Sequence, residues 1–211
     1  MPARKIPLNY RNITGYVATS KGGEYTYFES NLERDALILL EFDPEVKSYT
    51  TQYKRFYYHS DGKERHYTPD IYVNYHNGTK QFIEIKYRDD LWKDWKKLKP
   101  KFKAVIHALK STPDTRFKIL TEKEIRGTYL TNVIFLLPYR TKEYEDYQSL
   151  MIKKILSRFK TIMAKDLVSL CSSDFEEQAE FIHTLWCLVA QGSVQTDMHN
   201  PLTMNSYVWG K

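Results

Sequence analysis

The 211-residue sequence has little cysteine and no long apolar run, and each shortage excludes a class of protein. Cys171 and Cys187 are its only cysteines, too few for a disulfide framework or a thiolate metal site, which favours a reducing compartment. Without a stretch of about 18 apolar residues, no membrane span is expected. The first residues, MPARKIPLNYRN, lack the apolar segment and small-residue cleavage site of a secretory leader. We therefore expect a cytoplasmic protein that does not span a membrane.

Acidic residues are also fewer than basic ones, since 26 Asp and Glu face 32 Lys and Arg and leave a net charge of +6. Aromatic residues are plentiful by contrast, and 17 of them are tyrosines. This combination suits a polyanion, because cations neutralise phosphates and rings stack on bases. Many basic proteins bind no nucleic acid, so the charge supports such a partner without establishing it.

Helical spacing of apolar residues first occurs at residues 31–42, NLERDALILLEF. Ser30 or Asn31 can cap this helix, and Pro44 ends it because proline disfavours the α conformation of the residue before it. The first 25 or so residues of the chain carry turn formers, and we interpret them as an arm leading into the fold.

Strands are predicted next. Residues 46–58 are rich in β-branched and aromatic types and predict one or two strands, and Asp61-Gly62 indicates a turn. Two extended runs, 66–75 and 80–87, flank Asn77-Gly78 and predict a hairpin.

A Lys-rich amphipathic segment follows at 88–110, in which Pro100 marks either a helix start or a break. Residues 116–120 predict a further strand, and Thr121 with Glu124 has the pattern of a capping box. The order of these elements (helix, strands, hairpin, helix, strand) predicts an α+β or α/β layer fold with a mixed sheet, and we expect the α/β class, with helices flanking the sheet.

The last third of the chain changes character. Three helices are predicted at residues 146–159, 162–171 and 174–190, and short extended segments then surround Asn200-Pro201. Three helices followed by a hairpin are typical of a winged-helix-like domain, although they could simply complete a stable fold. We place the boundary between domains 1–144 and 145–211.

The strongest chemical pattern is Pro69-Asp70, thirteen residues, and then Glu84-Ile85-Lys86. Side chains alternate along a strand, so Glu84 and Lys86 project to one side, and the hairpin brings Asp70 near Glu84. Two carboxylates at one sheet edge are costly unless a cation compensates, and Mg²⁺ prefers oxygen ligands. Asp70, Glu84 and the backbone carbonyl of Ile85 would hold the metal, while Lys86 would act on the attacking water and the phosphate.

This pattern, PD-(D/E)xK, is typical of metal-dependent nucleases, but so short a motif also arises by chance. An edge strand often carries Glu and Lys for solubility alone. The strand–turn–strand context, with apolar Phe82, Ile83 and Ile85 around the charges, favours the nuclease interpretation.

A further carboxylate is expected from the first helix. Glu33 lies at the edge of the apolar stripe between Leu32 and Ala36, so it can reach inward. Glu29 and Asp35 are the competing candidates, and most helical glutamates are merely solvated.

The sequence resembles the TnsA family, the endonuclease subunits of heteromeric cut-and-paste transposases. The matching stretches appear in family order over most of residues 11–139: FESNLERDALILLEFDPEV (28–46), Gln52, YTPDIYV (67–73), FIEIKYR (82–88) and ILTEKEI (119–125). The resemblance implies catalytic roles for Glu33, Asp70, Glu84 and Lys86, with the acid of the LER triplet favouring Glu33 over Glu29. Some members carry glutamine where this chain has Glu84.

The same resemblance implies a restriction-endonuclease-like fold, with Mg²⁺ as cofactor and Mn²⁺ as a substitute. It also implies that the protein cleaves the 5′ ends of a transposon and that it is a bacterial protein associated with the nucleoid when it acts. The implied partners are a TnsB-type DDE transposase, which leaves this strand uncut, and a TnsC-type AAA+ ATPase, which contacts the C-terminal helices. Two alternatives stay open. One is a restriction or repair endonuclease of the same superfamily, and the other is a non-catalytic assembly module.

Lysines crowd the segment after Lys86. We interpret Lys93, Lys96, Lys97 and Lys99 as contacts to DNA phosphates, against the alternative of a solvated helix face. His66 is at best a residue that supports the site from beside it.

Overall fold

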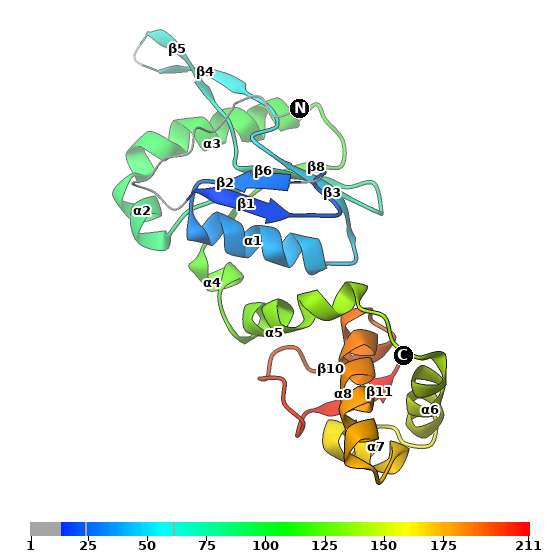
Figure 1. The fold of residues 1–211 in the computed structure, drawn as a ribbon. Coiled ribbons are helices and arrows are strands. Elements are labelled where there is room, and N and C mark those ends of the chain that lie inside the picture. The colour runs from blue at the N-terminus through cyan, green and yellow to red at the C-terminus, as the bar shows by residue number, and fades with distance from the viewer. Residues whose placement is uncertain (1–13, 24, 61) are drawn as a thin grey trace. The chain divides into compact units, whose positions relative to one another are not determined.

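The computed structural model describes residues 14–23, 25–60 and 62–211. The chain forms two compact units, one reaching Arg126 and the other beginning at Gly127 (Figure 1). Most of the predicted N-terminal arm, residues 1–13, lies outside the described residues. No helix in the described ranges is long and apolar enough to cross a membrane.

A four-stranded mixed sheet is the centre of the first unit. Its order is β3-β6-β7-β8, formed by Val46–Thr51, Ile71–Tyr75, Lys80–Ile85 and Thr115–Leu120. β6 pairs antiparallel with β3 and β7, and β8 runs parallel to β7. The predicted hairpin is confirmed as β6–β7, and Gly78 takes a φ of 86° in its turn, a conformation glycine adopts without steric cost.

Helices cover both faces of this sheet (Figure 1). α1 (Asn31–Phe42) packs Leu32, Ala36, Leu37 and Leu40 against one face, over Ile83 and Ile85. α3 (Trp95–Leu109) packs Leu98, Phe102, Val105 and Leu109 against the other, over Phe82. The mixed sheet between helices fits the expected restriction-endonuclease-like fold. α1 has its predicted bounds, and the Glu33 N–H donates to the Ser30 hydroxyl that caps it.

The extended run predicted at 66–75 is two strands rather than one. β5 (Lys63–Tyr67) ends before Pro69 and pairs with β4 (Phe56–Ser60) in a separate two-stranded sheet, while β6 begins at Ile71. Proline has no N–H to donate to a ladder, so the strand is interrupted there. Part of the expected arm is also a hairpin, since β1 (Gly15–Ala18) pairs with β2 (Tyr25–Phe28).

Pro100 neither starts nor breaks a helix. The break lies at Asp94, between α2 (Arg88–Lys93) and α3, and α3 continues through the proline. Four buried side chains at helical spacing hold α3 against the sheet, which offsets the hydrogen bond lost at Pro100. The predicted capping box is confirmed at α4 (Glu122–Ile125), with Thr121 and Glu124 as its members.

The second unit is mainly helical. Its helices are α5 (Thr128–Leu136), η1 (Leu137–Thr141), α6 (Asp146–Leu156), α7 (Ala164–Cys171) and α8 (Phe175–Ala190). β9 (Ile162–Met163), β10 (Val194–Thr196) and β11 (Tyr207–Gly210) form an antiparallel sheet of order β10-β11-β9. The three predicted helices are present as α6, α7 and α8, and Asp174 caps the last as expected.

The two units divide after Arg126, earlier than the predicted boundary at 144/145. α5 and η1 belong with the C-terminal helices because they pack there. The ring of Phe135 lies edge-on to that of Trp186, with 5.3 Å between the ring centres. The Asn132 side-chain amide donates hydrogen bonds to the carbonyls of Met198 and Asn200. The apolar run that precedes Pro138 is therefore core of the second unit.

A fragment of residues 1–126 should fold and unfold cooperatively, because the central sheet and its two covering helices are complete within it. A fragment of residues 1–144 should be less soluble, because it exposes Leu130, Val133 and Leu136, which are buried in the second unit. Gel filtration and thermal melting of both fragments check this. Equal solubility of the two fragments would contradict the boundary at Arg126.

Candidate active site

The register of β6 and β7 brings two acidic residues together. Ile71 pairs with Ile83, so the preceding residue, Asp70, lies across from Glu84. Asp70 Oδ2 accepts a hydrogen bond from the backbone N–H of Ile85 at 2.7 Å, and the two acids affect each other's pKa. The predicted juxtaposition of Asp70 and Glu84 is thus present in the structure.

Burial makes this pair resist full ionisation. Loss of solvent raises the pKa of Asp70 well above its ordinary value, and the charge of Glu84 raises it further. Burial likewise raises the pKa of Glu84, against the lowering effects of the Tyr67 hydroxyl and of Lys86. Both carboxyl groups are therefore harder to ionise than carboxyl groups in water.

Lys86 supplies the nearest cation. It follows β7 directly, and its Nζ lies 3.7 Å from Glu84 Oε1. Its side chain is 36% exposed whereas that of Glu84 is 4% exposed, so the ammonium group lies between the buried acid and solvent. A lysine in this position can reach both the acidic pair and a molecule that approaches from outside.

Glu33 adds a third acidic group to this electrostatic environment. Glu33 lies in the first turn of α1. Its Oε1 accepts a hydrogen bond from the Ser30 hydroxyl at 3.0 Å, and its Oε2 accepts one from the Glu29 N–H at 2.9 Å. Burial, and next the charge of Asp70, raise the pKa of Glu33 to about 7. Glu33 in turn raises the pKa of Glu84, so the three acids are coupled.

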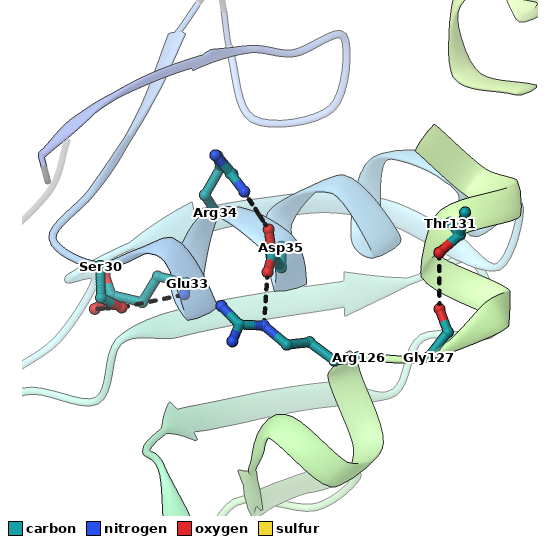
Figure 2. Close-up of polar contacts among 7 residues, drawn as sticks. All are labelled: Ser30, Glu33, Arg34, Asp35, Arg126, Gly127 and Thr131. Atoms are coloured by element: carbon teal, nitrogen blue, oxygen red, sulfur yellow. Dashed lines mark hydrogen bonds and ion pairs between the residues drawn. The ribbon is translucent and has the colours of Figure 1, made fainter. Parts of the chain in front are cut away.

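Asp35, the competing acid on α1, is paired with two arginines instead of the Asp70–Glu84 pair. Asp35 is buried, and its carboxylate accepts hydrogen bonds from Nη2 of Arg34 at 2.8 Å and from Nε of Arg126 at 3.0 Å. Figure 2 shows Asp35 between these two guanidinium groups, with Ser30 and Glu33 at the start of the same helix. Two arginines already balance its charge, which leaves Glu33 as the helical acid coupled to the Asp70–Glu84 pair.

No role at this site was assigned from the sequence to Tyr67 or Gln52, although both belong to the stretches that resemble the TnsA family. The Tyr67 hydroxyl donates to Glu84 Oε2, and the Lys101 Nζ lies 5.9 Å from the centre of the Tyr67 ring. Gln52 takes a φ of 52°, rare for a residue with a side chain, and its N–H donates to the Asp70 carbonyl at 3.0 Å. One tyrosine among 17 gives no sign of a role, and only its position three residues before Asp70 could have indicated one.

Other predicted residues lie away from the acidic pair. His66 is exposed and adjoins Tyr67 on β5, so alternation directs it to the opposite face. The four lysines expected to bind DNA are all exposed: Lys93 on α2, and Lys96, Lys97 and Lys99 on α3. Lys97 forms an ion pair with Asp94 at 3.5 Å. Lys101, by contrast, reaches the site through Tyr67.

The donors at this site fit a hard divalent cation. Asp70, Glu84 and Glu33 offer only carboxylate oxygens, and burial, followed by the charge of a neighbouring acid, raises their pKa values, so a bound cation would favour their ionised forms. Within the described ranges, no three His, Cys, Asp or Glu side chains form a ready-made metal cluster. Mg²⁺ tolerates this, because it keeps several waters and is commonly held by one or two carboxylates.

Part of the chain matches a known family. A family model described as TnsA-like endonuclease N terminal matches residues 43–122. The matched segment contains Asp70, Glu84 and Lys86, whereas Glu33 precedes it and the second unit follows it. No curated protein matches the chain.

Glu33→Gln should stabilise the metal-free protein near pH 8 and have little effect near pH 4. Because the folded-state pKa is raised from 4.5 to about 7, the folded chain holds an extra proton in this window, and stability is lost as the pH rises through it. At about 1.4 kcal/mol per pKa unit, the free energy of unfolding near pH 8 should rise by at most about 3 kcal/mol, and the hydrogen bond lost with the substitution reduces this gain. Urea unfolding in EDTA at both pH values measures the free energy of unfolding.

Glu176→Gln is the matched control, since Glu176 is an exposed acid in the first turn of α8. It should change the free energy of unfolding by only a few tenths of a kcal/mol at either pH. An equal effect of Glu33→Gln at both pH values would show that Glu33 is not held in a buried acidic environment.

Proposed function

We propose that this TnsA-like endonuclease, identified by its residues 43–122, is the DNA-cleaving subunit of a heteromeric cut-and-paste transposase and cuts the 5′ ends of a transposon. The observation that carries the proposal is the half-buried Asp70 across from the buried Glu84, with Lys86 beside them, inside the matched segment. Two carboxylates next to an accessible lysine suit hydrolysis of a phosphodiester.

The acidic pair would hold Mg²⁺, with Mn²⁺ as a substitute, and the carboxylate of Glu33 and the carbonyl of Ile85 would contribute. Once bound, the cation would polarise a phosphoryl oxygen and lower the pKa of the attacking water. Asp70 and Glu84 bind a cation in their ionised forms, and their pKa values are raised, so binding should weaken as the pH falls. Asp70 is oriented for this task by the Ile85 N–H.

Lys86 and Tyr67 have distinct parts in this proposal. Lys86, near Glu84 Oε1, orients the attacking water or accepts its proton and offsets charge on the scissile phosphate. Tyr67 holds the other oxygen of Glu84 and so fixes the orientation of that carboxylate. Replacing the tyrosine would release a carboxylate that must be held in place to bind a cation.

Double-stranded DNA is the proposed substrate, with exposed Lys93, Lys96, Lys97 and Lys99 contacting phosphates. The second unit is proposed to be winged-helix-like, because helix, strand, two helices and hairpin follow one another from α6 to β11. We propose that this unit binds a TnsC-type AAA+ ATPase and that a TnsB-type DDE transposase cuts the opposite strand. The site of action would be bacterial DNA in the cytoplasm.

The test is cleavage of a labelled transposon end in Mg²⁺ with the partner transposase present. The native chain should cut the 5′ strand, and Asp70→Asn should reduce the rate by orders of magnitude, because asparagine keeps the acceptor for the Ile85 N–H and removes the charge. Asp114→Asn is the matched control. Asp114 is exposed at the start of β8 with a φ of 57°, which asparagine tolerates, so this variant should cut normally.

Isothermal titration of Mn²⁺ gives a second readout that does not depend on activity, and Asp70→Asn should bind the ion more weakly than Asp114→Asn does. Cleavage by Asp70→Asn at the native rate would refute the assignment of Asp70. Cleavage of any duplex by the native chain, with no preference for transposon ends and no response to the transposase, would instead favour a restriction or repair nuclease.

A further inference from the structure

The two-stranded sheet β4–β5 projects from the first unit as a narrow ribbon. Figure 1 shows it extending beyond α3, and it pairs with no other strand of the described chain. Phe56 and Tyr67, paired at its base, are buried against Leu98, Phe102 and Val105 of α3. The base of the ribbon is therefore anchored in the core, while the rest leaves it.

Beyond that base, the ribbon offers two chemically different faces. Tyr58 and Arg65 pair on the face of Tyr67, and Ser60 pairs with Lys63 further out. The opposite face carries the exposed pairs Tyr57–His66 and His59–Glu64. Residues 54–65 contain four cationic side chains, Lys54, Arg55, Lys63 and Arg65, against the acids Asp61 and Glu64.

A ribbon of this kind gains little from burial. Tyr57 is 63% exposed, and its ring centre lies 6.3 Å from the ring centre of His66, which is also exposed. Two-stranded hairpins are marginally stable by themselves, and exposed aromatic rings add nothing to solubility. A ribbon with cations on one face and exposed rings on the other instead complements a nucleic acid, because phosphates attract the cations and the rings contact bases.

The ribbon is continuous with the active site. β5 ends at Tyr67, whose hydroxyl binds Glu84, and Asp70 follows three residues later. At about 3.4 Å per residue, Lys63 lies roughly 14 Å along the strand from Tyr67. The major groove of B-DNA is about 12 Å wide and admits a two-stranded ribbon, so a duplex gripped here would have its backbone within reach of the acidic pair.

We propose that the β4–β5 ribbon is a DNA-binding arm that enters the major groove of the duplex being cut. Lys63 and Arg65 contact phosphates at the edge of the groove, and the Tyr57–His66 face lies toward the bases. The ribbon thereby sets which phosphate reaches Asp70 and Glu84. This inference rests on the proposed nuclease function and adds the surface that positions its substrate.

The experiment compares two double variants that remove the same charge. Lys63→Gln with Arg65→Gln alters the ribbon, and Lys47→Gln with Lys118→Gln alters exposed lysines on β3 and β8. Fluorescence anisotropy with a labelled duplex, in EDTA and over a range of salt concentrations, measures affinity without cleavage. Melting curves should show that both variants are folded, since Phe56 and Tyr67 are untouched.

The ribbon variant should bind about tenfold more weakly than the native chain near 0.1 M salt. Its slope of log affinity against log salt should fall by about 1.8, because each lost phosphate contact removes about 0.9. The control variant should keep the native slope. In cleavage assays, the ribbon variant should also cut at altered positions or with a raised KM, while the control cuts as the native chain does.

Equal slopes and affinities for the two double variants would overturn the ribbon proposal and leave the nuclease proposal standing, provided that the native chain cuts DNA. Tighter binding to single strands than to duplex, lost in the ribbon variant, would also overturn it, because a groove-bound ribbon requires a duplex. A native chain that neither binds nor cuts DNA would refute both proposals together.

Discussion

The cost of ionising the acidic groups gathered at the end of the β6–β7 hairpin is the constraint on which the rest of the site depends. The register places Asp70 across from Glu84, and α1 adds Glu33 to the same electrostatic environment. Loss of solvent raises all three pKa values, and the charge of a neighbouring acid raises each of them further. Lys86 and the Tyr67 hydroxyl favour the ionised form of Glu84, and a divalent cation would favour ionisation of all three acids.

The scaffold explains how these groups stay in place. α1 and α3 pack on opposite faces of one sheet, so Glu33 approaches the acidic pair from one side and Lys101 approaches Tyr67 from the other. Gln52 fixes the backbone of Asp70 from β3 through a strained conformation. β5, which ends at Tyr67, also forms half of the β4–β5 ribbon. The proposed DNA-binding ribbon and Asp70 therefore belong to one continuous segment of the chain.

Much of this arrangement was predictable because it follows from local patterns. The helical spacing of residues 31–42, the Asn77-Gly78 turn and the Thr121 capping box each determine their own conformation, and strand alternation places Glu84 and Lys86 on one side. The role of Tyr67 was not predictable, because it depends on where β5 meets β7 in three dimensions. The division after Arg126 was missed for the same reason, since α5 is assigned by its packing on α8 rather than by composition.

The central claim is that Glu33, Asp70 and Glu84 share one acidic environment that a divalent cation neutralises. Carbon-13 NMR titration of the side-chain carboxyl groups, in EDTA and then in Mg²⁺, tests it most directly. The account predicts that Glu33 titrates with a pKa of about 7 in EDTA and well below that in Mg²⁺, with Asp70 and Glu84 moving in the same direction. A Glu33 that titrates near the ordinary 4.5 in EDTA, or that does not respond to Mg²⁺, would contradict it.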